Sequence, residues 1–230
     1  MAAYSAIDDS SAHFQVLTYT GNSTSTTSAD RTLTNDGNSD LQPDLVALWN
    51  RDSANNAGAR WWDSSRGVGQ NKGLTSSGAN AEGGPNDPEF GYINTLHSDG
   101  FGVREGTAGS NTRITTDRGE GGGDRYVAMQ WKANGGSTTN DTGGNIDSVT
   151  QANTTAGFSI VTYTGNGSVG QSVNHGLGAT PAAIFVKRRD GAADWFVYHQ
   201  TRGNTMHLHL NTTAAAATTS DWANYGPNAT

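Results

Sequence analysis

The feature that most constrains the fold is an internal repeat. Residues 14–22, FQVLTYTGN, return as residues 158–166, FSIVTYTGN, at an offset of 144 positions. Two further pairs of segments match at smaller offsets. Residues 43–49 match residues 181–187 at an offset of 138, and residues 61–67 match residues 197–203 at an offset of 136. Loops tolerate changes of length better than strands do, so the falling offset predicts a second copy with the same strands and shorter loops.

The second copy is expected to be incomplete. In the first copy a strand is predicted over residues 126–133, where one face carries Val127, Met129 and Trp131 and the other carries Gln130 and Lys132. At an offset of 136 its counterpart would fall near positions 262–269, beyond Thr230. We therefore expect either the N-terminal part of a longer protein or a second sheet that a partner subunit completes.

Composition favours β structure over helices or disorder. Hydrophobic residues make up 33% and charged residues 15% of the chain, and six Trp, seven Tyr and six Phe can fill a core that a disordered chain would lack. The polar residues are mainly turn and strand-edge types, so we predict an all-β fold of antiparallel sandwich type. The expected organisation is a sandwich over residues 1–133, a Gly/Asn/Thr-rich linker over 134–153, and a truncated sandwich repeat over 154–230.

Several classes of protein are excluded at this point. No apolar run approaches the roughly 20 residues of a membrane span, and the N-terminal residues lack the basic and apolar regions of a signal peptide. The chain has no cysteine, which rules out disulfides and thiolate metal sites. A net charge of −7 and a pI near 5.2 argue against a nucleic-acid partner.

The second copy carries a recognisable set of motifs. After the repeated TYTGN segment come HGLGATP, KRR, DWFVYH and LNTTAA, at residues 175–181, 187–189, 194–199 and 210–215. Together they resemble a repeated laminin-G or concanavalin-like domain of marine tailed-phage virion proteins of the tail-fibre type. The first copy departs from this pattern at residues 37–42, GNSDLQ, where the His-Gly-Leu-Gly turn is missing.

The resemblance implies a jelly-roll or concanavalin-like sandwich, complete in the first copy and incomplete in the second. It also implies a non-enzymatic structural protein of a tail fibre or adhesion appendage, involved in host attachment and located in the virion after assembly in the host cytoplasm. Its partners would be other virion proteins and further copies of the chain, with a trimer expected by analogy. The alternatives are a capsid decoration or head-fibre protein, and a carbohydrate-binding module for host surface polysaccharide.

Trp61 and Trp62 are the candidate ligand-binding residues. They are adjacent in a predicted strand, so one indole should face the core while the other is available for a host glycan or a subunit interface. We expect Trp49, Trp131 and Trp195 to lie in the core.

No cofactor or metal site is expected within one chain. His207 and His209 share one face of a predicted strand, so they are metal candidates only if chains assemble, and we interpret them as solvent-facing. Residues 35–40, an Asn/Asp-rich segment, are expected to form a turn and not a calcium loop.

We also expect no enzymatic activity. Gly165 to Gly170 fits the Gly-x-Gly-x-x-Gly pattern but precedes no helix, so it is interpreted as a hairpin turn. Glu82, Asp87 and Glu89 lie among Gly and Pro in a predicted loop, and no strand carries the paired carboxylates of a glycosidase.

Overall fold

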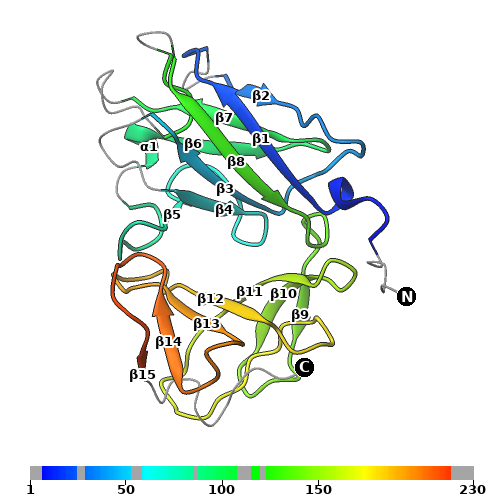
Figure 1. Ribbon diagram of the computed structural model, residues 1–230, viewed down its shortest axis with the longest axis vertical. Coiled ribbons are helices and arrows are strands. Elements are labelled where there is room, and N and C mark those ends of the chain that lie inside the picture. The colour runs from blue at the N-terminus through cyan, green and yellow to red at the C-terminus, as the bar shows by residue number, and fades with distance from the viewer. Residues whose placement is uncertain are drawn as a thin grey trace.

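The computed structural model describes residues 7–24, 29–52, 59–84, 87–107, 115–119 and 123–218, and the structural statements below concern these residues. The prediction of an all-β fold is confirmed, because antiparallel sheets account for nearly all regular structure. Helical structure amounts to one 3-10 turn, η1 (Ser10–Ala12), and one short helix, α1 (Asp87–Phe90). Figure 1 shows the first copy, coloured blue to green, above the second, coloured green to red.

The first copy, hereafter the first unit, is built from two sheets. One is five-stranded in the order β1-β8-β3-β4-β5 and the other three-stranded in the order β2-β7-β6. Their strands are β1 (Phe14–Thr20), β2 (Arg31–Leu33), β3 (Leu45–Asn50), β4 (Arg60–Asp63), β5 (Leu74–Thr75), β6 (Gly91–Leu96), β7 (Phe101–Glu105) and β8 (Arg125–Trp131). Both sheets contribute to one apolar core, so the unit is a sandwich.

Strand β8 shows how the sequence produces this core. Its side chains alternate as predicted, but the fully buried face carries Tyr126, Ala128 and Gln130. The opposite face, with Trp131, is only half-buried, because it packs under aromatic neighbours such as Phe14 and not between the sheets. The predicted alternation of side chains along β8 is therefore correct. The face that lies between the two sheets is the more polar one, because it includes Gln130.

The second copy, hereafter the second unit, contains two smaller sheets with the orders β11-β10-β9 and β12-β13-β14-β15. Their strands are β9 (Thr139–Asp141), β10 (Ser148–Asn153), β11 (Phe158–Tyr163), β12 (Ala183–Val186), β13 (Phe196–His199), β14 (Met206–His209) and β15 (Ala217–Thr218). Strands β11, β12 and β14 contain no fully buried residue, and every residue of β14 is half-buried.

The segment expected to be a linker over residues 134–153 contains two strands, β9 and β10. Strand β10 forms an antiparallel hairpin with β11, from Asn153 opposite Phe158 to Ser148 opposite Tyr163. Its buried residues are polar, and Gln151 donates hydrogen bonds to Ser64 Oγ and Ser65 Oγ of the first unit at 2.9 and 2.7 Å. The segment has few apolar side chains to bury. These hydrogen bonds, which satisfy its buried polar groups, hold it in place instead.

The internal repeat extends to strand pairing. Leu45 lies opposite Asp63 between β3 and β4, and Ala183 lies opposite His199 between β12 and β13, which are the same positions at offsets of 138 and 136. The hydrogen bond that closes the first pair, Ser64 N to Asp44 O at 2.8 Å, recurs as Gln200 N to Ala182 O at 2.8 Å. Strands β5 and β14 correspond in the same way, at an offset of 134.

Candidate functional site

Trp61 and Trp62 occupy opposite faces of β4, as predicted, but neither is freely exposed. Trp62 is completely buried in the core of the first unit. The half-buried Trp61 points toward the second unit, where its ring centroid lies 5.1 Å from that of Trp195 and 5.8 Å from that of Phe185. The outer indole was predicted to contact either a host glycan or another subunit. In the structure, the Trp61 indole contacts the second unit of the same chain.

Trp195 is the centre of this contact. Its side chain is buried, as expected, and its indole N–H donates to Thr75 O of the first unit at 2.8 Å. Trp49 and Trp131, which were expected in the core, are instead half-buried at the surface of the first unit.

A buried ion network lies beside the tryptophans. The Arg66 guanidinium, 3% exposed, contacts the carboxylates of Asp63 at 2.5 Å and Glu82 at 3.0 Å. Glu82 also accepts from Arg189 of the second unit at 2.8 Å, so the network crosses between the units. Backbone bonds run alongside, from Glu82 N to Arg189 O and from Ala193 N to Ala79 O, both at 2.9 Å. Glu82 therefore anchors the second unit to the first through its carboxylate.

The two candidate metal ligands converge. His207 Nε2 and His209 Nε2 lie 3.1 Å apart, and both rings pack against Phe196, with ring centroids 5.2 and 4.9 Å from its own. The pair is thus partly covered and not freely solvent-facing as expected. Two ring nitrogens at this separation can bind one ion, but no cluster of three or more His, Asp or Glu side chains able to hold a metal occurs in the described part of the chain. A metal at this pair stays a prediction for an assembly of several chains.

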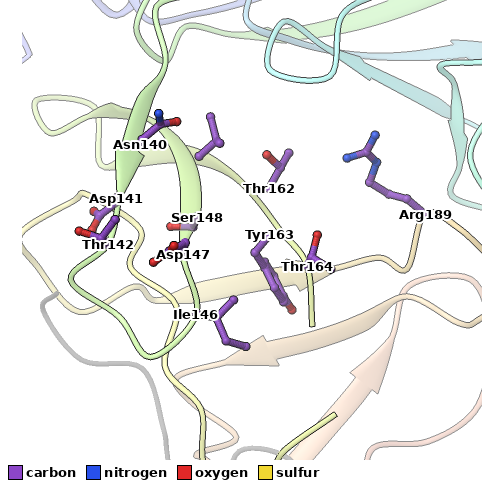
Figure 2. Close-up of a pocket in the computed structure, with 11 residues that line it drawn as sticks. Asn140, Asp141, Thr142, Ile146, Asp147, Ser148, Thr162, Tyr163, Thr164 and Arg189 are labelled. Carbon is purple, nitrogen blue, oxygen red and sulfur yellow. The ribbon is translucent and has the colours of Figure 1, made fainter. Parts of the chain in front are cut away.

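A concave surface lies in the second unit, over β9, β10 and β11. It is a cleft of about 550 Å³ whose lining includes Asp141, Asp147, Ser148, Tyr163 and Arg189. Figure 2 shows the Tyr163 ring between Thr162 and Thr164, with the two aspartates on one side and Arg189 on the other. The cleft therefore combines an aromatic ring with hydroxyl, carboxylate and guanidinium groups.

Tyr163 lacks the cross-strand aromatic partner that its counterpart in the first copy has. It corresponds to Tyr19, which lies opposite Tyr126 and stacks on it with ring centroids 4.9 Å apart and an interplanar angle of 13°. Tyr163 lies opposite Ser148, whose small side chain leaves the ring 47% exposed. Burial raises the pKa of both phenols, and it does so most strongly for Tyr19.

Sequence reasoning missed Tyr163, although the repeat contained the signal. Matching Tyr19 to Tyr163 shows that each copy has this ring, but only strand pairing shows which ring keeps an aromatic partner. Asp44 was also missed. Its fully buried carboxylate accepts from Ala133 N, Gly135 N and Gly136 N at 2.7, 2.8 and 2.7 Å, and so holds the chain where it leaves the first unit. Gly136 adopts a φ of 80° at this turn, a conformation that favours glycine.

Within the described residues, neither helical segment has the length and apolar character needed to cross a bilayer.

A family model described as a domain of unknown function, DUF7483, matches residues 9–230. No curated protein and no solved structure matches the chain.

Proposed function

We propose, from the premise that the chain belongs to the DUF7483 family of domains of unknown function, that it is a non-enzymatic structural protein of a bacteriophage virion. On this proposal it forms part of a tail fibre or similar adhesion appendage that takes part in host attachment. The virion role is supported by the resemblance of the motifs over residues 175–215 to phage virion domains.

The observation that supports the mechanical part of the proposal is the contact between the two units. The half-buried Trp61 packs against the buried Trp195, and Glu82, which the buried Arg66 holds, pairs with the partly exposed Arg189 of the second unit. Buried apolar area and paired charges hold modules in a fixed relation, whereas a flexible tether would let them move independently. A fixed relation between repeated modules is what an extended appendage requires.

Localisation on the particle tests this role. Gold-labelled antibody against the purified chain should decorate the tail or its fibres in electron micrographs of the phage that encodes it. Labelling of the head would favour the capsid decoration or head-fibre alternative. Absence of label from intact and disrupted particles, with the chain detected only in infected cells, would contradict a virion protein of either kind.

The cleft around Tyr163 favours a second candidate function, carbohydrate binding. A half-exposed aromatic ring offers a stacking platform for the apolar face of a sugar, and the surrounding carboxylates and hydroxyls can accept and donate hydrogen bonds to sugar hydroxyls. Trp61 and Trp62 are not available for this purpose, because one is packed between the units and the other is in the core. Tyr163 takes their place as the candidate glycan-binding residue.

Competition of phage adsorption tests the carbohydrate hypothesis. Purified chain should block adsorption, and Tyr163→Ala should lose most of this effect because the stacking ring is removed. Tyr163→Phe keeps the ring and should retain it. Val169→Ala alters an apolar side chain that is 93% exposed outside the cleft and should behave as the wild type. Equal blocking by all four proteins would place any receptor-binding surface elsewhere.

A further inference from the structure

The backbone turn that follows the repeated TYTGN segment has the same geometry in both units. In each turn the side-chain Oδ1 of the asparagine, Asn22 or Asn166, accepts from the backbone N–H two residues later at 3.0 Å. The residue between them has a positive φ, which is 53° at Ser23 and 76° at Gly167. Both asparagine carboxamides are therefore held in an Asx turn, folded back toward the peptide bond that follows them.

The two turns differ in the backbone amide directly after the asparagine. In the first unit Ser23 N–H donates to Asp117 O at 3.1 Å, and the Ser23 hydroxyl donates to Glu105 at 2.9 Å. In the second unit Gly167 N–H donates to no atom of the described residues. Residues 163–169 are all exposed, and a Cβ on Gly167 would meet nothing within 4 Å. The first amide is held in place by its acceptor, whereas the second is not.

The chain has one other Asn-Gly pair, Asn134 and Gly135, and there the amide is held. Asn134 is exposed, as Asn166 is. Gly135 N–H, however, donates to the buried carboxylate of Asp44 at 2.8 Å. The same dipeptide therefore occurs twice, once with its glycine amide bonded to a buried anion and once with that amide lacking an acceptor among the described residues.

This difference matters for a reaction that makes asparagine a chemically labile residue in water. The backbone nitrogen of the next residue attacks the carboxamide carbon Cγ and forms a bond to it. The Cγ–Nδ2 bond breaks, and Nδ2 leaves as ammonia with the proton from the attacking nitrogen. Water then opens the resulting succinimide ring at either of its carbonyl carbons, which gives aspartate or isoaspartate. Glycine hinders the attack least, because it has no Cβ.

The hydrogen bonds of each turn decide how readily the attack occurs. The N–H donated to Asn166 Oδ1 lies at the oxygen where negative charge develops as Cγ is attacked, so it stabilises the intermediate. Asn22 has the same bond. Ser23 and Gly135, in contrast, must release the acceptor of their N–H group before the nitrogen can turn toward Cγ, which raises the barrier. Asn166 therefore combines a polarised carboxamide with an amide that no described residue holds.

We propose that Asn166 is a site of spontaneous deamidation through attack by Gly167 N, and that Asn134 and Asn22 are protected by the hydrogen bonds of the amides that follow them. The product replaces a neutral amide by a carboxylate on the exposed loop after β11. Its isoaspartate form also adds a carbon atom to the backbone of that loop. The proposal does not depend on a virion role or on carbohydrate binding.

Ageing of the purified full chain tests the proposal. The protein is kept at physiological temperature and mildly alkaline pH, and the three asparagine peptides are then quantified by mass spectrometry, with isoaspartate detected by enzymatic methylation. Asn166 should react about tenfold or more faster than Asn134, because breaking one hydrogen bond raises the barrier by about that factor. In urea the two Asn-Gly pairs should react at similar rates, because unfolding removes the bond to Asp44.

Two variants assign the difference to the backbone amides. Gly167→Ser places the residue of the first unit in this turn and should slow the reaction of Asn166, because the added side chain hinders the attack. Asp44→Asn weakens the bond that holds the amide after Asn134, so it should speed the reaction there and leave Asn166 unchanged. Val169→Ala, on the same exposed loop, is the matched control and should react at the wild-type rate. Circular dichroism checks that each variant is folded.

Three results would overturn the proposal. The first is equal rates at Asn134 and Asn166 in the folded chain, which would mean that the bond to Asp44 gives no protection. The second is a faster reaction at Asn134 than at Asn166. The third is an Asn166 that stays intact in the folded chain although it reacts in urea, which would mean that the Asx turn protects the carboxamide.

Discussion

At the scale of single residues, Trp61 and Trp62 show how one strand serves two interfaces. Alternation along β4 turns the Trp62 indole into the core between two sheets and the Trp61 indole toward the second unit. Neither indole N–H has a hydrogen-bond partner in the described part of the chain. Both rings therefore contribute through burial and packing.

The two tryptophans should differ in their effect on stability. Trp62→Ala leaves a cavity in the core and should lower the free energy of unfolding by about 3–5 kcal/mol. Trp61→Ala removes a half-buried ring and should cost about 1–3 kcal/mol, mainly by weakening the contact with Trp195 and Phe185. Urea denaturation followed by circular dichroism measures both, and equal costs would contradict the distinction.

Asp52 should make the chain sensitive to acid. Hydrogen bonds from the Arg125 side chain and backbone lower the pKa of this carboxyl from 3.8 to about 2. Because the pKa in the folded state lies below the usual value, its stabilising effect is complete above pH ~4 and is lost as the pH falls toward 2. Asp52→Asn should therefore flatten the dependence of the urea midpoint on pH between 5 and 2.

A matched control for this effect is Asp36→Asn, which changes an exposed carboxyl directly before the bend at residues 37–39. It should leave the acid dependence as in the wild type. The same slope for Asp52→Asn and for the wild type would show that the ion pair with Arg125 does not contribute.

At the scale of elements, the sequence predicted strands better than it predicted connections. Periodicity and the repeat identified β1, β8 and β11, because their apolar residues alternate and recur. Strand β9 was not predicted because none of its residues is buried and it carries no apolar pattern. Strand β10 was not predicted, since its buried residues are polar and are stabilised by partners distant in sequence, such as Gln151 with Ser64 and Ser65. Local patterns carry no information about such partners. The cleft around Tyr163 was missed for the same reason, because it depends on Ser148 lying opposite that ring.

The link from β8 to β9 depends on Asp44. Asp44→Asn replaces one acceptor oxygen by an N–H₂ group, which cannot accept from the backbone N–H groups that now converge on the carboxylate. The free energy of unfolding should fall by about 1–3 kcal/mol. Hydrogen exchange should also become faster at Gly135 and Gly136, whereas exchange within β6 and β7 should not change. Unaltered exchange at both glycines would show that other contacts hold this turn.

At the scale of the whole molecule, the two units are expected to unfold together. Their contact combines two indoles packed at a tilt, the ion pair of Glu82 with Arg189, and backbone hydrogen bonds between distant segments. Differential scanning calorimetry of the wild type should show a single transition.

Trp195→Ala should break this coupling. It removes the central ring of the contact and the hydrogen bond to Thr75 O, so the second unit should unfold at a lower temperature in a separate transition. Trp49→Ala, in the first unit and half-buried, is the matched control and should shift the transition without splitting it. A single transition in the Trp195 variant would mean that the remaining contacts couple the units.

The matched register of the two units also has a genetic consequence. The offset between corresponding strands is 138 for β3 and β12, 136 for β4 and β13, and 134 for β5 and β14. The connections β12–β13 and β13–β14 are therefore each two residues shorter than their counterparts in the first unit. The cross-strand partners of these strands are nevertheless the same. Unequal crossing-over between the two halves of the gene, at any point inside these strands, would therefore yield a hybrid strand that keeps the register with its neighbour. The longer product of such an exchange retains the whole first unit, including β8 between β1 and β3, so repeats can be added in this way without loss of strand pairing.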